Sequence, residues 1–273
     1  MGKISGTATR TISITSGKGG VGKTTLVANL AVHLAEKGNK VLILDGDMGM
    51  ANIDIFFGVR PSYSIMDLLN EQVSMEEVIV DVGSNISLVP GGSGIRELNN
   101  LSPFQRRSLL DAIGSMTRKF DYLLVDTAPG ISDNVLYLNA SSQVASVIIT
   151  PDPASLADSY ALIKVLNRTH RSDRFSIICN QVRDEKEGLG LFHRFSEIVS
   201  RFLYIGIDYW GSIPMDLQLR RATHLQKLIV KHDPQCDSSL AIRNIAGAME
   251  SSVNRTGRTG GLQVFWESYV GVA

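Results

Sequence analysis

One segment near the amino terminus, residues 11–37, constrains the fold of this chain more than any other. It begins with a β-branched run typical of a strand, continues through the loop sequence SGKGGVGK, and ends in apolar spacing typical of a helix. Gly38 then supplies a usual helix stop signal. A strand joined to a helix by a glycine-rich loop predicts a βα unit, and chains of such units form mostly parallel sheets.

Short apolar runs alternate with helical patterns along the rest of the chain. Several of these runs are almost continuously apolar, as expected of strands that are covered on both faces. The predicted strands are residues 11–15, 40–44, 86–89, 122–125, 144–150, 175–179 and 207–212. The predicted helices are residues 24–37, 158–168 and 238–252, with a further helix that starts after Ser102 at Pro103. The pattern favours an α/β fold, a doubly wound and mostly parallel sheet with helices on both faces.

The overall composition disfavours several classes of protein. The 273 residues include 27 basic and 27 acidic side chains, so no net field attracts nucleic acid or an anionic membrane. Two cysteines are too few for a disulfide framework, which indicates a reducing cytoplasm. No apolar stretch approaches the roughly 20 residues that span a bilayer. We expect one domain over residues 1–253, a polar glycine-rich linker over residues 254–261, and a separate apolar segment over residues 262–273.

The glycine loop satisfies the pattern G-x-x-x-x-G-K-[ST] between a strand and a helix, the context that this phosphate-binding motif requires. Its glycines let backbone N–H groups turn toward an anion, and the helix N-terminus adds partial positive charge. Lys23 is expected to reach the β- and γ-phosphates, Thr24 to coordinate Mg²⁺, and Thr25 to bond the α-phosphate. The predicted contacts to ATP or ADP in this loop are Gly17, Lys18, Gly19, Gly20, Val21, Gly22, Lys23, Thr24 and Thr25.

Three carboxylates follow two of the predicted strands. Asp126 ends the apolar run in DYLLVDTAPG, where a P-loop protein needs a carboxylate to hold the water shell of Mg²⁺. Gly130 then offers a backbone amide to the γ-phosphate. Asp45 and Asp47 lie just past the strand in VLILDGDMGMAN, at the carboxyl edge where α/β sheets bind ligands. An ordinary turn is the alternative explanation for these two aspartates.

Three motifs, KGGVGKTT, DGDMGMAN and DTAPG, together resemble those of the deviant Walker A ATPases, a family that includes MinD, the ParA partition proteins and the nitrogenase iron protein. By this resemblance Lys18 is the signature lysine, which in family dimers reaches the phosphates of the partner subunit as a cation supplied in trans. Asp47 matches the residue that orients the attacking water, and Asp45 supports the metal–water network. The resemblance thus implies a homodimer that forms with ATP and a catalytic set of Lys18, Lys23, Asp45 and Asp47.

The layout of nearly the whole chain resembles, more narrowly, the FlhG (FleN) type of MinD-like regulators of polar flagellar number. The segments ASLADSYALIKVLNRTH, LSP and SIPMD carry this narrower resemblance. It implies that Asp158 and Lys164 face a protein partner: the flagellar GTPase FlhF, a FleQ-type transcription activator or flagellar switch-complex proteins. The alternative for these two residues is a solvated ion pair that contributes little. The residues that the resemblance implies for adenine contact are Asn180, Pro214, Met215 and Asp216.

The chain departs from the family pattern at two positions in these motifs. Pro129 stands where alanine is usual, which removes one N–H from the loop expected to sense the γ-phosphate. This departure keeps a second hypothesis open, a nucleotide-locked binding module that hardly turns over. Gly46 also stands where alanine is usual, and we expect it to loosen the acidic loop. The first eleven residues lack the DQ-type motif with which some FlhG proteins stimulate FlhF.

The apolar residues of the terminal segment fall on one face of a predicted helix. They are Leu262, Phe265, Trp266, Tyr269 and Val270, at positions i, i+3, i+4, i+7 and i+8. After a flexible linker this stripe favours reversible association with the inner face of the cell membrane, the role of the equivalent segment in MinD-like proteins. The alternative is docking on the chain's own domain, and both hold if ATP releases a docked helix. Only Arg255 and Arg258 precede the stripe, so attraction to anionic lipid would be weak.

Other functions fit parts of the sequence. The basic patches NRTHRSDR and RRATHLQK suggest a ParA-like partition ATPase, but zero net charge makes direct DNA binding the weaker hypothesis. A metabolic ligase related to dethiobiotin synthetase would need a substrate pocket that the sequence does not identify. The five histidines show no ligand spacing with the cysteines, so no zinc site is expected. An iron–sulfur role is not expected either, because no cysteine flanks the switch segments of the P-loop site. We therefore predict a slow, dimer-dependent ATPase that acts as a switch in the placement of polar flagella and in flagellar gene expression.

Overall fold

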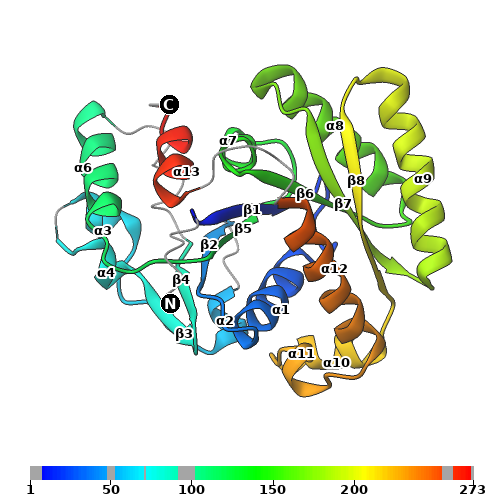
Figure 1. Cartoon of the computed structure of the whole chain (residues 1–273), viewed down its shortest axis with the longest axis horizontal. Coiled ribbons are helices and arrows are strands. Elements are labelled where there is room, and N and C mark those ends of the chain that lie inside the picture. The colour runs from blue at the N-terminus through cyan, green and yellow to red at the C-terminus, as the bar shows by residue number, and fades with distance from the viewer. Residues whose placement is uncertain (1–7, 48–52, 71, 92–101, 254–260, 272–273) are drawn as a thin grey trace, which may run out of the picture.

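The computed structural model describes residues 8–47, 53–70, 72–91, 102–253 and 261–271. Within these residues the chain forms one sheet with helices on both faces (Figure 1). The strands lie in the order β3-β4-β2-β5-β1-β6-β7-β8, and every neighbouring pair is parallel except β3 and β4. Their bounds are β1 (Arg10–Thr15), β2 (Val41–Gly46), β3 (Val80–Gly83), β4 (Ile86–Val89), β5 (Tyr122–Thr127), β6 (Val144–Ile149), β7 (Arg174–Val182) and β8 (Gly206–Pro214). The parallel strands therefore bring their carboxyl ends to one edge of the sheet.

The helices connect the strands and bury both faces of the sheet. Their bounds are α1 (Lys23–Glu36), α2 (Ile53–Phe57), α3 (Ile65–Leu69), α4 (Met75–Val78), α6 (Pro103–Gly114), α7 (Asp133–Ser141), α8 (Pro153–His170), α9 (Glu185–Phe202), α10 (Leu217–His224), α11 (Ile229–His232), α12 (Asp237–Val253) and α13 (Leu262–Tyr269). Figure 1 shows α1 and α12 on one face of the sheet and α6, α7, α8, α9 and α13 on the other.

Alternate residues of the buried strands feed separate cores. Val41 and Ile43 of β2 pack with α1 and α12, whereas Leu42 and Leu44 point to the opposite face and pack with α6 and α13. The residues of β6 and β7 that face α8 and α9 form a third cluster around Phe195. Because both faces of the central strands are buried, the continuous apolar runs in the sequence are explained by the layering.

The doubly wound α/β fold predicted from the sequence is confirmed, and each of the seven predicted strands is present. Ser102 caps α6 as expected, because its Oγ accepts a hydrogen bond of 3.3 Å from the Gln105 amide. The helix predicted over residues 158–168 begins earlier, at Pro153, where the Asp152 side chain accepts from the Ala154 amide at 3.0 Å. The sequence analysis missed β3, a short antiparallel strand at the edge of the sheet.

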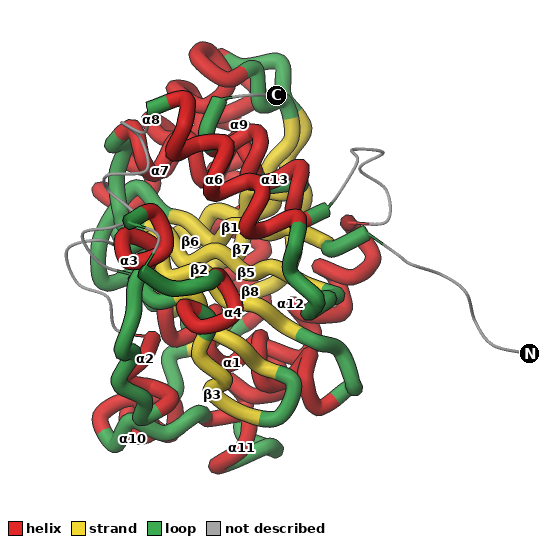
Figure 2. Tube along the Cα trace, turned by 90° about the vertical axis from the view of Figure 1, so that its left-hand side faces the viewer, coloured by secondary structure: helices red, strands yellow, loops and turns green. Residues whose placement is uncertain are grey.

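The C-terminal helix α13 is docked on the domain rather than exposed. Both views place α13 beside α6 (Figures 1 and 2), and it also contacts α7. The stripe side chains of Phe265, Trp266, Tyr269 and Val270 are buried, and Leu262 is half-buried. The sequence interpretation favoured lipid over docking; the structure shows the docked alternative, because α6 and α7 offer an apolar surface that the stripe covers. The predicted linker lies outside the described residues except for Gly261.

Candidate functional site

The glycine loop runs from the end of β1 to the start of α1, as the sequence predicted. Gly20 and Gly22 have φ values of 75° and 93°, a region that favours glycine. Gly17 needs the absence of a side chain for another reason: a Cβ there would overlap the backbone of Asp158 in α8. The loop is thus packed against α8 on one side and leads at Gly22 into the N-terminus of α1, which favours an anion.

Lys23 lies inside the loop and is only 7% exposed. Its Nζ donates a hydrogen bond of 3.0 Å to the Ser16 hydroxyl, which in turn donates to the carbonyl of Lys18 at 2.6 Å. Burial lowers the pKa of Lys23, and the carboxylates of Asp126 and Asp47 partly oppose that effect. The ammonium is held at the carboxyl edge, where a nucleotide phosphate would supply a stronger counter-charge.

Asp45 and Asp126 are paired residues on the neighbouring strands β2 and β5. Both are about 1% exposed, and burial raises the pKa of Asp45 to about 7 and raises that of Asp126 in the same way. The Thr24 hydroxyl bonds the Asp126 carboxylate, while Asp126 Oδ1 has no hydrogen-bond partner among the described residues. A buried carboxylate oxygen without a partner, beside a threonine hydroxyl, fits the outer shell of a hydrated Mg²⁺ ion.

The acidic loop stays close to these groups as far as the described residues extend. The Asp47 amide donates a hydrogen bond of 3.1 Å to Asp45 Oδ1, so the two aspartates form a local turn. The site groups predicted from the ends of β2 and β5 are therefore brought together. Residues 48–52, which complete the motif DGDMGMAN, lie outside the described residues.

Lys18 has an ion-pair partner within the same subunit, which the sequence analysis did not foresee. Its Nζ donates to the carboxylate of Asp152, the residue that caps α8. The hydrogen bond from Lys18 lowers the pKa of Asp152. Both side chains are more than 40% exposed (43% and 42%), unlike the buried Lys23. The two lysines of the loop thus occupy different environments.

The loop after β5 touches the phosphate loop. The Gly130 amide donates a hydrogen bond of 3.0 Å to the carbonyl of Ser16, and Gly130 has a φ of 93°. Pro129 faces Gly19 closely enough that a Cβ on the glycine would lie 3.7 Å from the proline ring. The amide that the sequence analysis assigned to the γ-phosphate therefore bonds the backbone that precedes the glycine loop.

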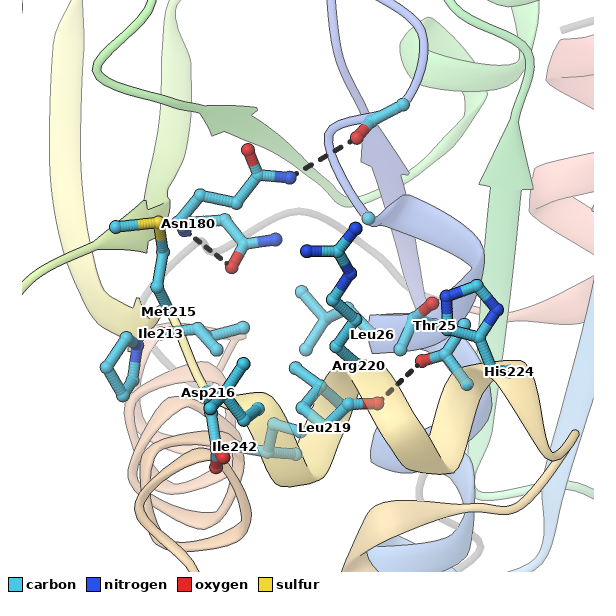
Figure 3. Close-up of a pocket in the computed structure, with 16 residues that line it drawn as sticks. Thr25, Leu26, Asn180, Ile213, Met215, Asp216, Leu219, Arg220, His224 and Ile242 are labelled. Carbon is cyan, nitrogen blue, oxygen red and sulfur yellow. Dashed lines mark hydrogen bonds between the residues drawn. The ribbon is translucent and has the colours of Figure 1, made fainter.

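A pocket of about 520 Å³ opens beside the phosphate loop, and the four predicted adenine contacts line it (Figure 3). The carboxylate of Asp216 caps α10, accepting from the Gln218 amide at 2.7 Å. Asn180 Nδ2 donates to the carbonyl of Val21 at 2.7 Å, so its amide is bonded to the loop. The sequence analysis missed one side of the pocket, which is formed by Arg220, Thr223 and His224 of α10. No local pattern marks those residues, because their place depends on how α10 folds back over the strand ends.

The predicted partner-facing residues lie on α8, the helix against which the phosphate loop is packed. Asp158 is exposed and Lys164 is half-buried, both on α8, and exposed Phe202 at the end of α9 stacks edge-on against Tyr160 of α8. No group of three or more histidine, cysteine or acidic side chains among the described residues is arranged to hold a metal ion. None of the described helices is long and apolar enough to cross a membrane.

A strand, a glycine loop and a helix, with a buried lysine at the end of the loop and carboxylates on nearby strands, define the class of P-loop nucleoside triphosphatases. Residues 9–177 match the family model described as an AAA domain. The chain is 35% identical to the antiactivator FleN of Pseudomonas aeruginosa, covering 95% of this chain and 92% of FleN. It is 34% identical to the flagellum site-determining protein YlxH of Helicobacter pylori, covering 94% of this chain and 85% of YlxH.

Solved structures agree with these sequence relatives. The MinC:MinD cell division complex of Aquifex aeolicus matches with a TM-score of 0.72 and 28% identity, over 89% of this chain and 96% of that one. MinD of Pyrococcus horikoshii, solved with Mg-ADP, matches with a TM-score of 0.67 and 27% identity, over 92% and 99%. The chain belongs to the MinD and FleN family of AAA-domain ATPases. It is accordingly an enzyme that hydrolyses ATP, and its family binds nucleotide.

Proposed function

We propose that this ATPase is a dimerisation switch: Mg²⁺ and ATP join two chains, the pair binds the membrane and flagellar partners, and slow hydrolysis separates it. The observation that carries the proposal is the contrast between the two loop lysines. Lys23 is buried in its own loop, whereas Lys18 lies at the protein surface and forms an exposed ion pair with Asp152. A cation held at the surface by an exposed pair is easily transferred to a phosphate of a second subunit, because such pairs contribute little stability.

The residues at the carboxyl edge are well suited to hold Mg·ATP. We assign Thr24 and Asp126 to the magnesium ion and its water shell, with Asp45 supporting that shell. Bound magnesium neutralises phosphate charge. The glycine-loop amides and Lys23 would bind the phosphates, and Asn180, Pro214, Met215 and Asp216 would surround the base. Asp47 would orient the attacking water, since an ordinary carboxylate is a better positioning group than a base at neutral pH.

Lys18 would complete the site of the other subunit. When the two faces meet, each Lys18 would leave Asp152 and reach the phosphates bound by the partner subunit, as a cation placed where negative charge develops. Two incomplete sites would thereby become two complete ones. Hydrolysis would then depend on the dimer, and loss of the γ-phosphate would remove the charge that holds Lys18 across the interface.

The biological context rests on the relatives. One is named an antiactivator and another a flagellum site-determining protein, and the solved MinD relative is in complex with MinC. We propose that this chain regulates the number or placement of polar flagella and flagellar gene expression. Its partners would be FlhF, a FleQ-type activator or switch-complex proteins. Asp158, Lys164 and the exposed aromatic ring of Phe202 would face such a partner. Reversible membrane association would follow from release of α13.

The test measures mass and turnover. Sedimentation with ADP and then with ATP should give a monomer and a dimer. Lys18→Ala should bind ATP as tightly as the natural chain but remain monomeric and inactive. Lys119→Ala is the matched control, because this exposed lysine precedes β5 at the opposite edge of the sheet. A Lys18→Ala chain that dimerises and hydrolyses normally would refute the proposal.

A mixing experiment separates action in trans from action in cis. Lys18→Ala and Asp47→Ala chains are each expected to be inactive alone. In a mixed dimer, the site of the Lys18→Ala subunit keeps Asp47 and receives Lys18 from its partner, so turnover should reappear when the two are combined. If Lys18 served its own subunit, no site in the mixture would be complete and turnover would stay absent.

A further inference from the structure

The docked helix α13 is linked to the acidic loop by a chain of hydrogen bonds. The Tyr269 hydroxyl donates to Asn134 Oδ1, on α7. Asn134 Nδ2 in turn donates to the carbonyl of Gly46 at 3.4 Å. Tyr269 and Asn134 are each 3% exposed, so water does not compete for these bonds. Gly46 separates Asp45 from Asp47, so the chain ends between the two aspartates of the site.

The packing around Gly46 makes this connection stiff. A Cβ at Gly46 would lie 2.5 Å from Leu138 Cδ1 of α7 and 2.9 Å from the carbonyl oxygen of Asp126. The glycine therefore does not loosen the loop, as the sequence suggested, but lets α7 pack directly on it. Alanine at this position would push α7 away from the loop. A displacement of α7 or α13 would consequently move the backbone between Asp45 and Asp47.

The docked position of α13 also contains unsatisfied polar atoms. Trp266 Nε1 and Gln263 Oε1 are buried without a hydrogen-bond partner among the described residues. Buried polar atoms of this kind oppose docking, because in another environment they would find partners. The apolar stripe holds the helix in place and these two atoms weaken the hold. The two opposing contributions make the docking of α13 easier to reverse.

Two hydrogen bonds hold the peptide segment between Asp45 and Asp47 in one arrangement. Asp45 Oδ1 accepts the Asp47 amide, so an oxygen that would face the metal–water network is engaged within the loop itself. The Gly46 carbonyl is fixed by Asn134 on the other side of the same peptide segment. Any rotation of this peptide segment would break the hydrogen bond from Asn134, and the hydroxyl of Tyr269 fixes the Asn134 side chain.

We propose that Asn134 is a positioning residue for the Asp45–Asp47 loop and that docked α13, through Tyr269, uses it to keep hydrolysis slow. Release of α13 frees the Asn134 side chain, and the loop then reaches the arrangement that turnover needs. By reciprocity, a nucleotide that moves the loop also weakens the docking of α13. This inference rests on the proposed switch for its trigger, ATP, but names the residues that carry the coupling.

The test uses the full chain and removes a single oxygen. Tyr269→Phe keeps the apolar ring but removes the hydroxyl, so α13 should be released more often. The kcat should rise by about fivefold, the effect of one buried hydrogen bond, and by reciprocity the affinity for ATP should not fall. Tyr209→Phe is the matched control, because its hydroxyl also donates one bond, 2.9 Å to Glu185, but lies on β8 away from the loop. The control should leave kcat unchanged.

A double-mutant comparison isolates the role of Asn134. If Tyr269 acts through Asn134, Tyr269→Phe should have no further effect on kcat in an Asn134→Ala chain. An equal acceleration in both backgrounds would overturn the proposal. An unchanged kcat in Tyr269→Phe, while the helix is shown to be released, would overturn it as well.

Release of the helix is read from Trp266. Only Trp210 and Trp266 occur in the chain, so Trp210→Phe leaves Trp266 as the single fluorophore; should that variant not fold, the difference between natural and Trp266→Phe spectra gives the same signal. Its emission should move to the red in Tyr269→Phe and when the natural chain binds ATP, but not ADP. A failure of the dimer switch would appear as an unchanged mass in ATP. A failure of the coupling would appear as additive effects of Tyr269→Phe and Asn134→Ala on kcat, whether or not ATP changes the mass of the protein.

Discussion

Asp45 is a carboxylate whose charge the surrounding fold opposes. Its ordinary pKa of 3.8 is raised to about 7, first by burial and in smaller part by the nearby aspartates Asp47 and Asp54, against two backbone hydrogen bonds that lower it. The folded chain therefore keeps a proton on Asp45 at pH values where the unfolded chain has lost it. Stability from this group is complete below pH 4 and is lost as the pH rises toward 7.

Asp45→Asn should remove that loss, because an amide has the same shape and no charge to desolvate. Over the full window the difference is on the order of 4 kcal/mol, so the variant should unfold at a higher temperature than the natural chain at pH 8, in the presence of EDTA. Near pH 4 the two should unfold together. Thermal unfolding across this range is the measurement, and equal slopes against pH would contradict the assignment.

The role of a single side chain could be predicted from the sequence only where a local sequence pattern indicates it. Lys23 is marked by the glycine-loop motif, whereas Asp126 and the Asp45–Asp47 pair lie at strand ends, which parallel strands must bring to one edge. The partner of Lys18 could not be found, because Asp152 is distant in sequence and its local pattern before Pro153 indicates only a helix cap. Gly46 was misread for the same reason, since the side chain it makes room for comes from α7.

At the scale of elements, the end of β7 holds the phosphate loop in shape. Asn180 and Gln181 donate their side-chain amides to the carbonyls of Val21 and Gly20, at 2.7 and 3.3 Å. With the carbonyls turned toward β7, the loop N–H groups are left to face an anion. Gln181 adopts a φ of 60°, an uncommon conformation for a non-glycine residue that such contacts can sustain. The strand end thus contacts the phosphate loop as well as lining the pocket beside it.

Asn180→Ala should therefore weaken the binding of two ligands, ATP and tripolyphosphate. A residue that contacts only the adenine would change the affinity for ATP and leave that for tripolyphosphate untouched. If Asn180 also shapes the loop, both affinities should fall by about fivefold to tenfold. His224→Ala, on the α10 wall of the same pocket, is the control that should spare tripolyphosphate. Calorimetric titration distinguishes the cases, and an unaltered tripolyphosphate affinity in Asn180→Ala would restrict the residue to the base.

Elements were predictable where their periodicity was uninterrupted. The central strands are continuously apolar because both faces are covered, whereas β3 is short, half-exposed and antiparallel. The helix α9 contains Gly188 and Gly190, which obscured its otherwise amphipathic pattern. Gly188 is required by packing rather than by a turn, since a Cβ there would lie 2.5 Å from Cβ of Ser212 on β8. A tertiary contact of this kind leaves no signal in the local sequence.

For the molecule as a whole, the apolar stripe of α13 was recognised but its partner was not. The same spacing of Phe265, Trp266 and Tyr269 suits a lipid surface and a groove between two helices, because both ask only for one apolar face. The choice depends on what α6 and α7 leave uncovered, with Leu109 and Leu138 among the buried residues of that cluster. In the present conformation α13 completes the core, so the proposed membrane binding would use the same apolar surface that now stabilises the fold.

Truncation after Gly261 tests that double use. Without α13 the residues that it covers on α6 and α7 are exposed, and the free energy of unfolding should fall by about 5–9 kcal/mol, because three large side chains lose their burial. ATP affinity should persist, since the phosphate loop and base pocket belong to other elements. ATP-dependent binding to liposomes of phosphatidylethanolamine and phosphatidylglycerol should disappear. The control Val264→Ser, on the exposed side of α13, should change neither the free energy of unfolding nor the binding to liposomes.

The two readouts of the truncated chain answer separate questions. Reduced stability with liposome binding retained would show that α13 is a docking element and that lipid is met by another surface. Unchanged stability with binding abolished would show that the groove does not depend on the helix and that the segment serves the membrane alone. Only the loss of both, with ATP affinity preserved, agrees with a helix that exchanges one apolar environment for another as the subunits join.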